Sequence, residues 1–399
     1  MQRYESLIIF AEIHQIMRRF LGLISVSILL AVACKPAEPY KGYNHVIVPG
    51  TNTGTDPGTD PGTDPGTDPG TGDNPDTPPV VIPDVPFTNP VKTNGSWADP
   101  TIWKDGNYYY TIATGSNTIL RSTDLVHWAS FGNSARSNAA NTAAKAYGNA
   151  FWAPDVIKIG NYWLMYRSIR NSAADSNIGV FKSLYSTGPF QWVGIVTSSK
   201  DTGIKDTIDP EVVIDPDTGK VWLFFGSVGK MHRVELDSSG LALAAGATYT
   251  HVAGLDINQN SSRSKVYEGC YLHKHGDYWY LFASAGLYSN YTYKLVVGRS
   301  ATLTGEFVDE EGRKMKEGYA TPVISSANGD TFYGPGHNGE IFTDSTGQDY
   351  ILYHCHNNSI DPANPGKRYL MLQRIFWGPK GWPYVQDGKP AATDISPKF

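Results

Sequence analysis

The chain has 399 residues, of which 18% are charged and 12% aromatic, and its formal net charge is −5 at pH 7. A mildly acidic chain without a basic patch is not typical of a nucleic-acid-binding protein, so we expect no nucleic-acid partner. Helical periodicity is scarce after residue 90, while 41 Gly and 26 Pro separate many short apolar runs. This composition indicates an all-β fold.

Residues 1–34 form an N-terminal extension and a predicted secretory signal. The basic pair Arg18-Arg19 precedes an apolar run of 14 residues, 20–33, which is too short to span a bilayer comfortably. The end of this run, Ala-Val-Ala-Cys, resembles a bacterial lipobox, in which the Cys is acylated after cleavage. We therefore expect lipidation of Cys34 and an exported lipoprotein of the outer membrane or cell surface. The alternative is a plain signal peptide with an incidental Cys.

Residues 35–86 are expected to be a disordered tether. Their centre repeats Thr-Asp-Pro-Gly four times between Thr55 and Gly70, and such a segment has almost no apolar surface to bury. The tether would act as a spacer between the membrane and the folded domain.

Five later stretches share one pattern: a polar lead residue, a short apolar run, a turn with Gly, and an aromatic run. Each pattern indicates a β-hairpin with a polar residue at its entrance. Successive leads lie 56, 54, 59 and 69 residues apart, and they are Asp99, Asp155, Asp209, Glu268 and His337. Five repeats of about this length predict a five-bladed β-propeller over residues 87–399.

Three of the lead residues, Asp99, Asp209 and Glu268, are candidates for acid–base chemistry. The first strand of each propeller blade lines the central channel, so carboxylates at the entrances of three such strands would converge on one pocket. Any one of them alone is more typical of a turn acid or cap. Hydrolysis of a glycosidic bond needs an acid to protonate the leaving oxygen and a carboxylate on the opposite face, and these residues supply both.

The ordered motifs around these residues resemble glycoside hydrolase family 43, whose members are inverting five-bladed propellers. The motifs are Trp97-Ala98-Asp99-Pro100, Phe151-Trp152-Ala153-Pro154-Asp155, Ile208-Asp209-Pro210, Tyr267-Glu268-Gly269 and Gly334-Pro335-Gly336-His337-Asn338. The resemblance implies that Asp99 is the general base, that Glu268 is the general acid, and that Asp209 orients the acid and raises its pKa.

The motif that contains His337, together with the segment 290–300, most resembles the endo-acting arabinanases of that family. By this resemblance His337 would ligate a metal, usually calcium, that is held mostly by water in the central channel. Calcium prefers oxygen ligands, so one imidazole is an unusual partner for it. The alternative is a hydrogen-bonded core histidine in a Gly- and Pro-rich turn.

Further residues are expected to contact substrate. Trp152 is a candidate platform for sugar stacking or, equally, a core Trp between blades. Asp155 is interpreted as structural or substrate-orienting, because the family does not use it as an acid or base. The resemblance adds the candidate substrate contacts Gly179, Ile208, Gly226 and Ser227.

We therefore expect a monomeric enzyme that hydrolyses α-1,5-linked arabinan of plant cell walls internally and with inversion. An exo-acting arabinofuranosidase or β-xylosidase of the same family is the first alternative. A non-catalytic glycan-binding lipoprotein should have lost an acid, and a structural scaffold would leave the three acids unexplained. The sequence leaves open whether Cys270 and Cys355 form a disulfide.

Overall fold

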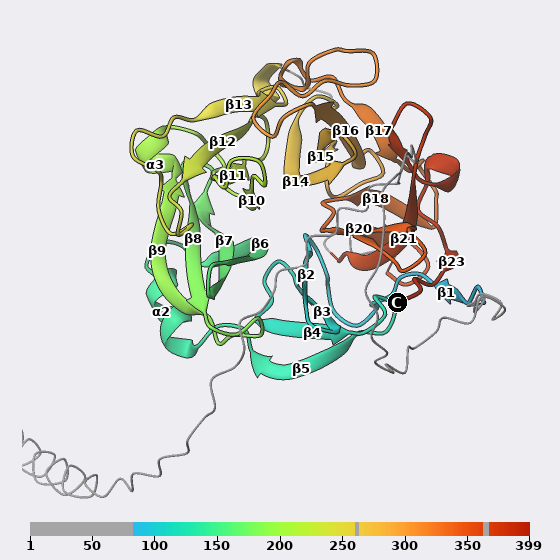
Figure 1. The fold of residues 1–399 in the computed structure, drawn as a ribbon, viewed down its shortest axis with the longest axis horizontal. Coiled ribbons are helices and arrows are strands. Elements are labelled where there is room, and N and C mark those ends of the chain that lie inside the picture. Colours follow the sequence, from blue (N-terminus) through green and yellow to red (C-terminus); the bar gives the residue numbers. More distant parts are fainter. Residues whose placement is uncertain (1–82, 260–262, 362–366) are drawn as a thin grey trace, which may run out of the picture. The chain divides into compact units, whose positions relative to one another are not determined.

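The computed structural model describes residues 83–399 except 260–262 and 362–366, and Figure 1 shows these residues in colour. Residues 78–399 form one compact unit, distinct from residues 1–77. The predicted signal, Cys34 and nearly all of the predicted tether lie outside the described residues. Within the described part, no helix combines the length and apolar character needed to cross a membrane.

Five antiparallel sheets are arranged in a ring around a central channel, which confirms the predicted five-bladed β-propeller (Figure 1). Blades 1 and 2 are formed by β2 (Thr101–Asp105), β3 (Tyr108–Ile112), β4 (Thr118–Ser122) and β5 (Ala129–Ser134), and by β6 (Ala150–Ile159), β7 (Tyr162–Ser172), β8 (Asp175–Ser183) and β9 (Gln191–Ser198). Blades 3 and 4 are formed by β10 (Glu211–Ile214), β11 (Val221–Phe225), β12 (Met231–Leu236) and β13 (Thr250–Ala253), and by β14 (Tyr267–His275), β15 (Tyr278–Ala285), β16 (Lys294–Ser300) and β17 (Thr321–Ile324).

Blade 5 differs because two short strands share its innermost position. Both β18 (Phe332–Gly336) and β19 (Ile341–Thr343) pair with β20 (Asp349–Asn357), and the sheet continues through β21 (Tyr369–Trp377) and β22 (Pro383–Tyr384). Outside the blades, β1 (Pro86–Thr88) pairs with β23 (Thr393–Ile395) and so joins the two ends of the ring. Two short helices, α2 (Asn138–Lys145) and α3 (Ser199–Thr202), lie next to blade 2.

The hydrophobic core consists of five clusters, one at each interface between neighbouring blades. In β7, Trp163 and Met165 pack in the cluster shared with blade 1, while Leu164 and Tyr166 pack in the cluster shared with blade 3. Side chains of a strand alternate between the two faces of its sheet, and both faces of each blade are covered by neighbours. The second strands therefore appear in the sequence as continuous aromatic and aliphatic runs.

The buried cysteines Cys270 and Cys355 are both free thiols and are not joined in a disulfide. They belong to the clusters on the two faces of blade 4, because Cys270 packs toward blade 3 and Cys355 lies in the interface with blade 5. Apolar packing, and not a covalent link, therefore holds these blades together.

Candidate active site

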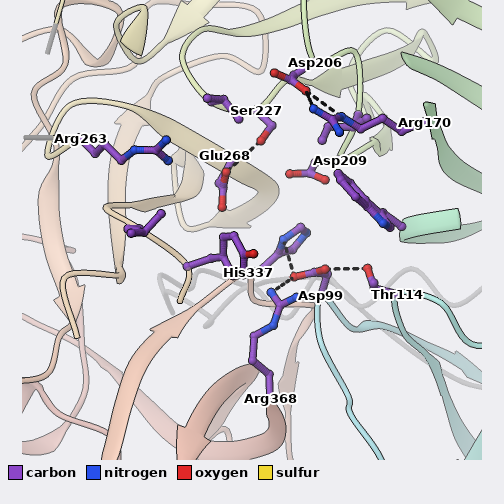
Figure 2. A pocket seen from close by; sticks show the side chains of 15 residues that line it. Asp99, Thr114, Arg170, Asp206, Asp209, Ser227, Arg263, Glu268, His337 and Arg368 are labelled. Atoms are coloured by element: carbon purple, nitrogen blue, oxygen red, sulfur yellow. Dashed lines mark hydrogen bonds and ion pairs between the residues drawn. The ribbon is translucent and has the colours of Figure 1, made fainter. Parts of the chain in front are cut away.

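The three predicted carboxylates line one cavity of about 450 Å³ at the entrance of the central channel. Asp99 precedes β2 of blade 1, Asp209 precedes β10 of blade 3, and Glu268 is the second residue of β14 in blade 4. Figure 2 shows these three side chains and that of His337 converging in the middle of the cavity. The volume of this cavity falls within the range of roughly 300–1,000 Å³ that is typical of ligand sites.

At the entrance of four of the five inner strands, one residue has a positive φ angle in the left-handed region. The φ angles are 52° at Asp99, 57° at Asp209, 45° at His337 and 60° at Gly269. Non-glycine residues rarely adopt this conformation, and such strain is concentrated at functional sites. At Gly269, a Cβ atom would lie 2.8 Å from Cγ of His337, so only glycine allows the backbone of Glu268 to approach the histidine this closely.

Asp99 is a buried carboxylate that is held from several sides. Its Oδ1 atom lies 2.8 Å from Nη1 of Arg368 and 3.2 Å from Nδ1 of His337, while its Oδ2 atom accepts a 2.6 Å hydrogen bond from Oγ1 of Thr114. Burial alone would raise the pKa of Asp99, but Arg368 and His337 hold it well below its ordinary value. Asp99 is therefore ionised at any working pH near neutrality.

His354 is a buried, neutral ring that contacts both Asp99 and Tyr293. Its Nδ1 atom accepts a 3.1 Å hydrogen bond from the backbone N–H of Asp99, and its ring stacks at 5.9 Å and 6° on Tyr293. Burial and the nearby Arg368 hold the pKa of His354 well below its ordinary value. The ring thus remains a neutral acceptor and fixes the backbone that carries Asp99.

Glu268 is held by two hydroxyl groups. Oγ of Ser227 donates to Oε2 at 2.9 Å, and the Tyr293 hydroxyl donates to Oε1 at 2.8 Å. Ser227 follows β11 of blade 3 and Tyr293 precedes β16 of blade 4, so two blades fix the orientation of this carboxyl group.

Asp209 is almost fully buried beside Glu268. Its backbone N–H donates to Oγ of Ser168 at 2.8 Å, and its Oδ2 atom accepts a 3.3 Å hydrogen bond from the N–H of Gly269. Burial raises the pKa of Asp209 to about 7 although His337 opposes the shift, and the negative charges of Glu268 and Asp99 add to it. A proton is therefore held among these carboxylates near neutral pH.

Polar and aromatic side chains extend the cavity on both sides of the carboxylates. On one side, Arg170 forms a 2.9 Å ion pair with Asp206, and its guanidinium lies 4.8 Å from the ring centre of Trp152. Trp152 is 36% exposed and lines the cavity. Figure 2 shows Arg263 on the other side of Glu268 from Arg170. Polar and aromatic side chains therefore line the cavity on both sides of the carboxylates.

Of the six predicted substrate contacts, Trp152, Ile208 and Ser227 line the cavity. The other three, Asp155, Gly179 and Gly226, are not among the residues that line it. Asp155 is buried in the channel wall and accepts a 2.8 Å hydrogen bond from the N–H of Val212, so it links two inner strands. Gly179 packs inside blade 2, where a Cβ atom would lie 2.6 Å from the Trp192 ring, and at Gly226 it would lie 2.4 Å from the carbonyl oxygen of Lys230. These two glycines are explained by close packing.

His337 lines both the main cavity and a second, smaller cavity in the channel. The smaller cavity has a volume of about 10 Å³, which is room for one water-sized species. Burial alone would lower the pKa of His337, but Asp99, Asp209 and Glu268 raise it to about 9. The small cavity is also lined by Glu211, Glu340 and Asn338, and the amide oxygen of Asn338 is buried without a hydrogen-bond partner among the described residues.

This oxygen-rich wall fits a hard cation. Burial raises the pKa of Glu340 to about 8 and that of Glu211 well above its ordinary value; the negative charge of Asp155 raises both values further, and the charge of Glu340 adds to that of Glu211. Such mutual repulsion is what a bound cation would relieve. Nδ1 of His337 pairs with Asp99, so a metal would bind the other ring nitrogen and displace its proton. The charge of the metal would then take the place of the imidazolium charge near Asp99.

The sequence profile of the glycosyl hydrolases family 43 matches residues 87–383, from β1 into β22. The chain belongs to glycosyl hydrolase family 43. This confirms the predicted resemblance, and the family 43 domain is a glycoside hydrolase with three carboxylates in its cavity.

Relatives of this family 43 domain include enzymes of both modes of attack. The extracellular exo-α-(1→5)-L-arabinofuranosidase of Cellvibrio japonicus is 30% identical over 310 residues, covering 72% of this chain and 86% of that protein. The extracellular endo-α-(1→5)-L-arabinanase 1 of Bacillus subtilis is 30% identical over 300 residues, covering 71% and 86%. A solved structure of a Cellvibrio cellulosa α-L-arabinanase with arabinohexaose has a TM-score of 0.61 at 28% identity and covers 73% of this chain and 96% of that one.

Sequence reasoning missed several residues of this family 43 site. Thr114, His354 and Arg368 hold Asp99, and Arg170, Asp206 and Arg263 line the cavity. Arg368 is 269 residues from Asp99 in the chain, so no local motif links the two. One local signal was present: Asp99, Ala153 and Asp209 each precede a Pro, which places Ala153, and not Asp155, in register with the acids.

Proposed function

We propose that this protein is an inverting glycoside hydrolase that cleaves α-1,5-L-arabinofuranosidic linkages within arabinan. The observation that carries the proposal is the convergence of Asp99, Asp209 and Glu268, from three blades, on one cavity with different electrostatic surroundings. The substrate follows from the relatives, which are named as enzymes of α-1,5-linked arabinan. Their description as extracellular also supports export of this protein.

Asp99 is assigned as the general base. Its Oδ1 atom faces two cationic side chains, whereas Oδ2 accepts one hydrogen bond from Thr114 and keeps a second lone pair. A water molecule donating to this lone pair would be activated for attack on the anomeric carbon. Thr114 and Arg368 fix the direction of the lone pair, and Arg368 keeps the carboxylate ionised.

Glu268 is assigned as the general acid. It protonates the glycosidic oxygen as the bond to the anomeric carbon breaks, while Asp99 removes the proton of the attacking water on the opposite face. Asp209 lines the same cavity beside Glu268, and a hydrogen bond to Ser168 fixes its backbone. Its role is to repel negative charge from Glu268 and so keep a proton available at the pair.

Internal cleavage is favoured because lining residues lie on both sides of the acid and base. Trp152, Arg170 and Asp206 form one side, and Arg263, Leu287 and Tyr288 line the cavity as well. The second candidate is exo-cleavage, which is the activity named for the Cellvibrio japonicus relative.

The test is product analysis on linear arabinan with the purified protein. Endo-cleavage produces mixed oligosaccharides at early times, exo-cleavage produces one small product only, and the absence of products on arabinan would overturn the proposal. Proton NMR of the first product then tests the mechanism. Inversion of the anomeric configuration is expected, and retention would make Asp99 a nucleophile.

We also propose that calcium binds in the channel at His337, with Asn338, Glu211 and Glu340 supplying oxygen ligands directly or through water. The ion would supply positive charge that offsets the buried carboxylates. Chelation should lower the melting temperature of the purified protein, and His337→Ala should remove this sensitivity. An unchanged melt after verified metal removal would contradict a stabilising ion.

For the N-terminal part we propose export and anchoring through a lipid on Cys34. The predicted signal, the lipobox-like residues and the repeats that follow them support this proposal. Replacement of Cys34 with Ser should release the protein from the membrane fraction. A soluble wild-type protein, or a variant that stays fully membrane-associated, would refute the anchor. Gel filtration of the soluble variant tests the expected monomer.

A further inference from the structure

A second group of metal-type side chains lies at the far end of blade 4 from the carboxylates. His273 and His275 are two residues apart on β14, so both side chains lie on the face that packs against blade 5. Asp349 begins β20 of blade 5. One possible ligand atom from each of these three residues lies within 4.8 Å of the others. Seven residues of extended strand, roughly 23 Å, separate His275 from Glu268.

The two imidazoles are free to coordinate a metal at neutral pH. Burial lowers the pKa of His273 to about 4 and also lowers that of His275, so both rings are neutral. Among the residues that the structure describes, none forms a hydrogen bond with the ring nitrogens of His273.

The surroundings hold the three side chains close to one another. The Trp377 ring stacks on His275 with ring centres 3.8 Å apart and planes 9° apart, and on His273 at 5.8 Å and 16°. The indole N–H of Trp377 donates to Oδ2 of Asp349 at 2.7 Å, and Thr343 donates to Oδ1 at 2.5 Å. Hydrogen-bonded carboxylates and restrained histidines are the usual supporting shell of a metal site.

We propose that His273, His275 and Asp349 bind a divalent transition-metal cation of the zinc type. Two imidazoles and one carboxylate suit zinc and similar metals, whereas calcium would require mostly oxygen ligands. The His275 side chain is 39% exposed, which gives the ion an entry path and leaves a further position for water. Ligand atoms of a tetrahedral zinc site lie roughly 3.4 Å apart, so binding draws the three side chains together.

The site bridges two blades. Two ligands come from the inner strand of blade 4 and the third from blade 5, at an interface that also contains apolar packing and hydrogen bonds such as that from the N–H of Ile341 to the Tyr271 hydroxyl. An ion that binds only the folded ring would stabilise this interface by mass action. The inference concerns a site separate from the carboxylates and does not depend on the proposed activity.

The test uses Zn²⁺ on the chelator-stripped chain, with bound zinc measured by mass spectrometry and affinity by calorimetry. We expect one zinc ion per chain at this site, a Kd of 10 μM or tighter, and a higher melting temperature. Co²⁺ should give the visible absorption of a site with nitrogen ligands. His275→Phe retains a ring that stacks on Trp377, and it should weaken zinc binding at least tenfold. His273→Gln is the second variant, and the same loss is expected.

Two controls separate this site from other zinc-binding groups. His337→Ala removes the histidine of the carboxylate cavity, and the zinc difference between the parent and His275→Phe should persist in that background. His127→Ala removes an exposed histidine that pairs with Asp124 at 2.7 Å and should leave the affinity unchanged. The proposal is overturned if the wild type shows no zinc-dependent melt and no Co²⁺ absorption, or if folded His275→Phe and His273→Gln bind zinc as the parent does.

Discussion

Asp99 and Glu268 carry the same functional group, but their neighbours differ in charge. Asp99 faces the cationic Arg368 and His337, whereas Glu268 accepts hydrogen bonds from two neutral hydroxyls and lies beside the Asp209 carboxyl. The first environment favours a permanent carboxylate, whereas in the second burial raises the pKa of Asp209 to about 7. This difference supports the proposed base and acid roles.

The two roles predict different failures on mutation. Asp99→Ala should lower kcat by roughly 10²–10⁴ on every substrate, because water is no longer activated. Glu268→Ala should cause a similar loss on arabinan but a much smaller one on an aryl arabinoside, whose acidic leaving group needs no protonation. Steady-state kinetics on both substrates provide the measurement. Equal losses for Glu268→Ala on the two substrates would contradict the assignment.

Arg368 should control the acid limb of the pH–rate profile. Removing its charge in Arg368→Gln raises the pKa of Asp99, so the base becomes protonated at a higher pH than in the wild type. Activity should therefore fall more at pH 5 than at pH 8. Arg374→Gln is the matched control, because Arg374 lies in the same blade and pairs with Asp394 away from the cavity. An unshifted acid limb in Arg368→Gln would refute the prediction.

Asp209→Asn tests the third carboxylate. The substitution keeps the shape of the side chain but removes negative charge next to Glu268, so the alkaline limb of the pH–rate profile should move to lower pH. The full profile of kcat/KM on arabinan is the measurement, and an alkaline limb that stays in place would exclude a charge effect of Asp209.

At the scale of the elements, side chains of one inner strand bind the backbone of the next. Asp155 accepts from the N–H of Val212, Glu211 from Leu272, the Tyr271 hydroxyl from Ile341, and Glu340 from Ile102. These bonds join blade 2 to 3, 3 to 4, 4 to 5 and 5 to 1. They fix the relative positions of the inner strands at whose entrances the three carboxylates of the cavity lie.

The buried carboxyl group of Asp155 makes the free energy of unfolding depend on pH. Burial raises the pKa of Asp155 from 3.8 to about 7, so the folded state holds a proton that the unfolded chain releases. Stability should therefore fall as pH rises from about 4 to about 7 and then level off. Asp155→Asn has no proton to release, and it should gain on the order of 2–4 kcal/mol relative to the wild type between pH 4 and pH 8.

Urea unfolding of the two proteins in chelator, at a series of pH values, measures this gain. The matched control is Asp217→Asn, because the Asp217 side chain is 71% exposed. A constant difference between Asp155→Asn and the wild type across the pH range would show that Asp155 is not protonated in the folded state.

At the scale of the whole molecule, the ring is closed by the N-terminal segment. Besides the pairing of β1 with β23, the N–H of Val91 donates to the carbonyl of Leu370, and that of Trp97 to the carbonyl of Arg368. Phe87 is buried in the cluster between blades 5 and 1. The same closure brings Arg368 to Asp99, so closure of the ring and assembly of the site are coupled.

Phe87→Ala should therefore destabilise the domain by about 3–5 kcal/mol, the usual cost of removing a buried Phe side chain. Val85→Ala is the control: Val85 is 55% exposed, its backbone bond with Ser396 is kept, and a change within about 0.5 kcal/mol is expected. Denaturant unfolding compares the two variants. Equal effects would show that burial of Phe87 does not contribute to closure.

The sequence by itself determined the blades and the identity of the three carboxylates. Both can be predicted from short stretches of sequence. Each hairpin has its own apolar runs and turn residues, and Asp99, Asp209 and Glu268 lie within short motifs that recur at the blade period. The same period led to Asp155 as a fourth lead residue. In the structure Asp155 lies within β6, two positions beyond Ala153, which is the residue in register with Asp99 and Asp209, and it belongs with Glu211 and Glu340 to the deeper layer.

Only the tertiary structure decided which groups set the charge of each carboxylate. His354 on β20 and Arg368 in the loop before β21 reach Asp99 across the interface between blades 5 and 1, whereas Thr114 and Tyr293 lie in loops of the same blades as Asp99 and Glu268. Such contacts depend on how neighbouring sheets pack and on where the ring closes, and no local pattern encodes those distances. The pairing of His273 and His275 with Asp349 arises in the same way, because blade packing brings together residues that are more than 70 positions apart.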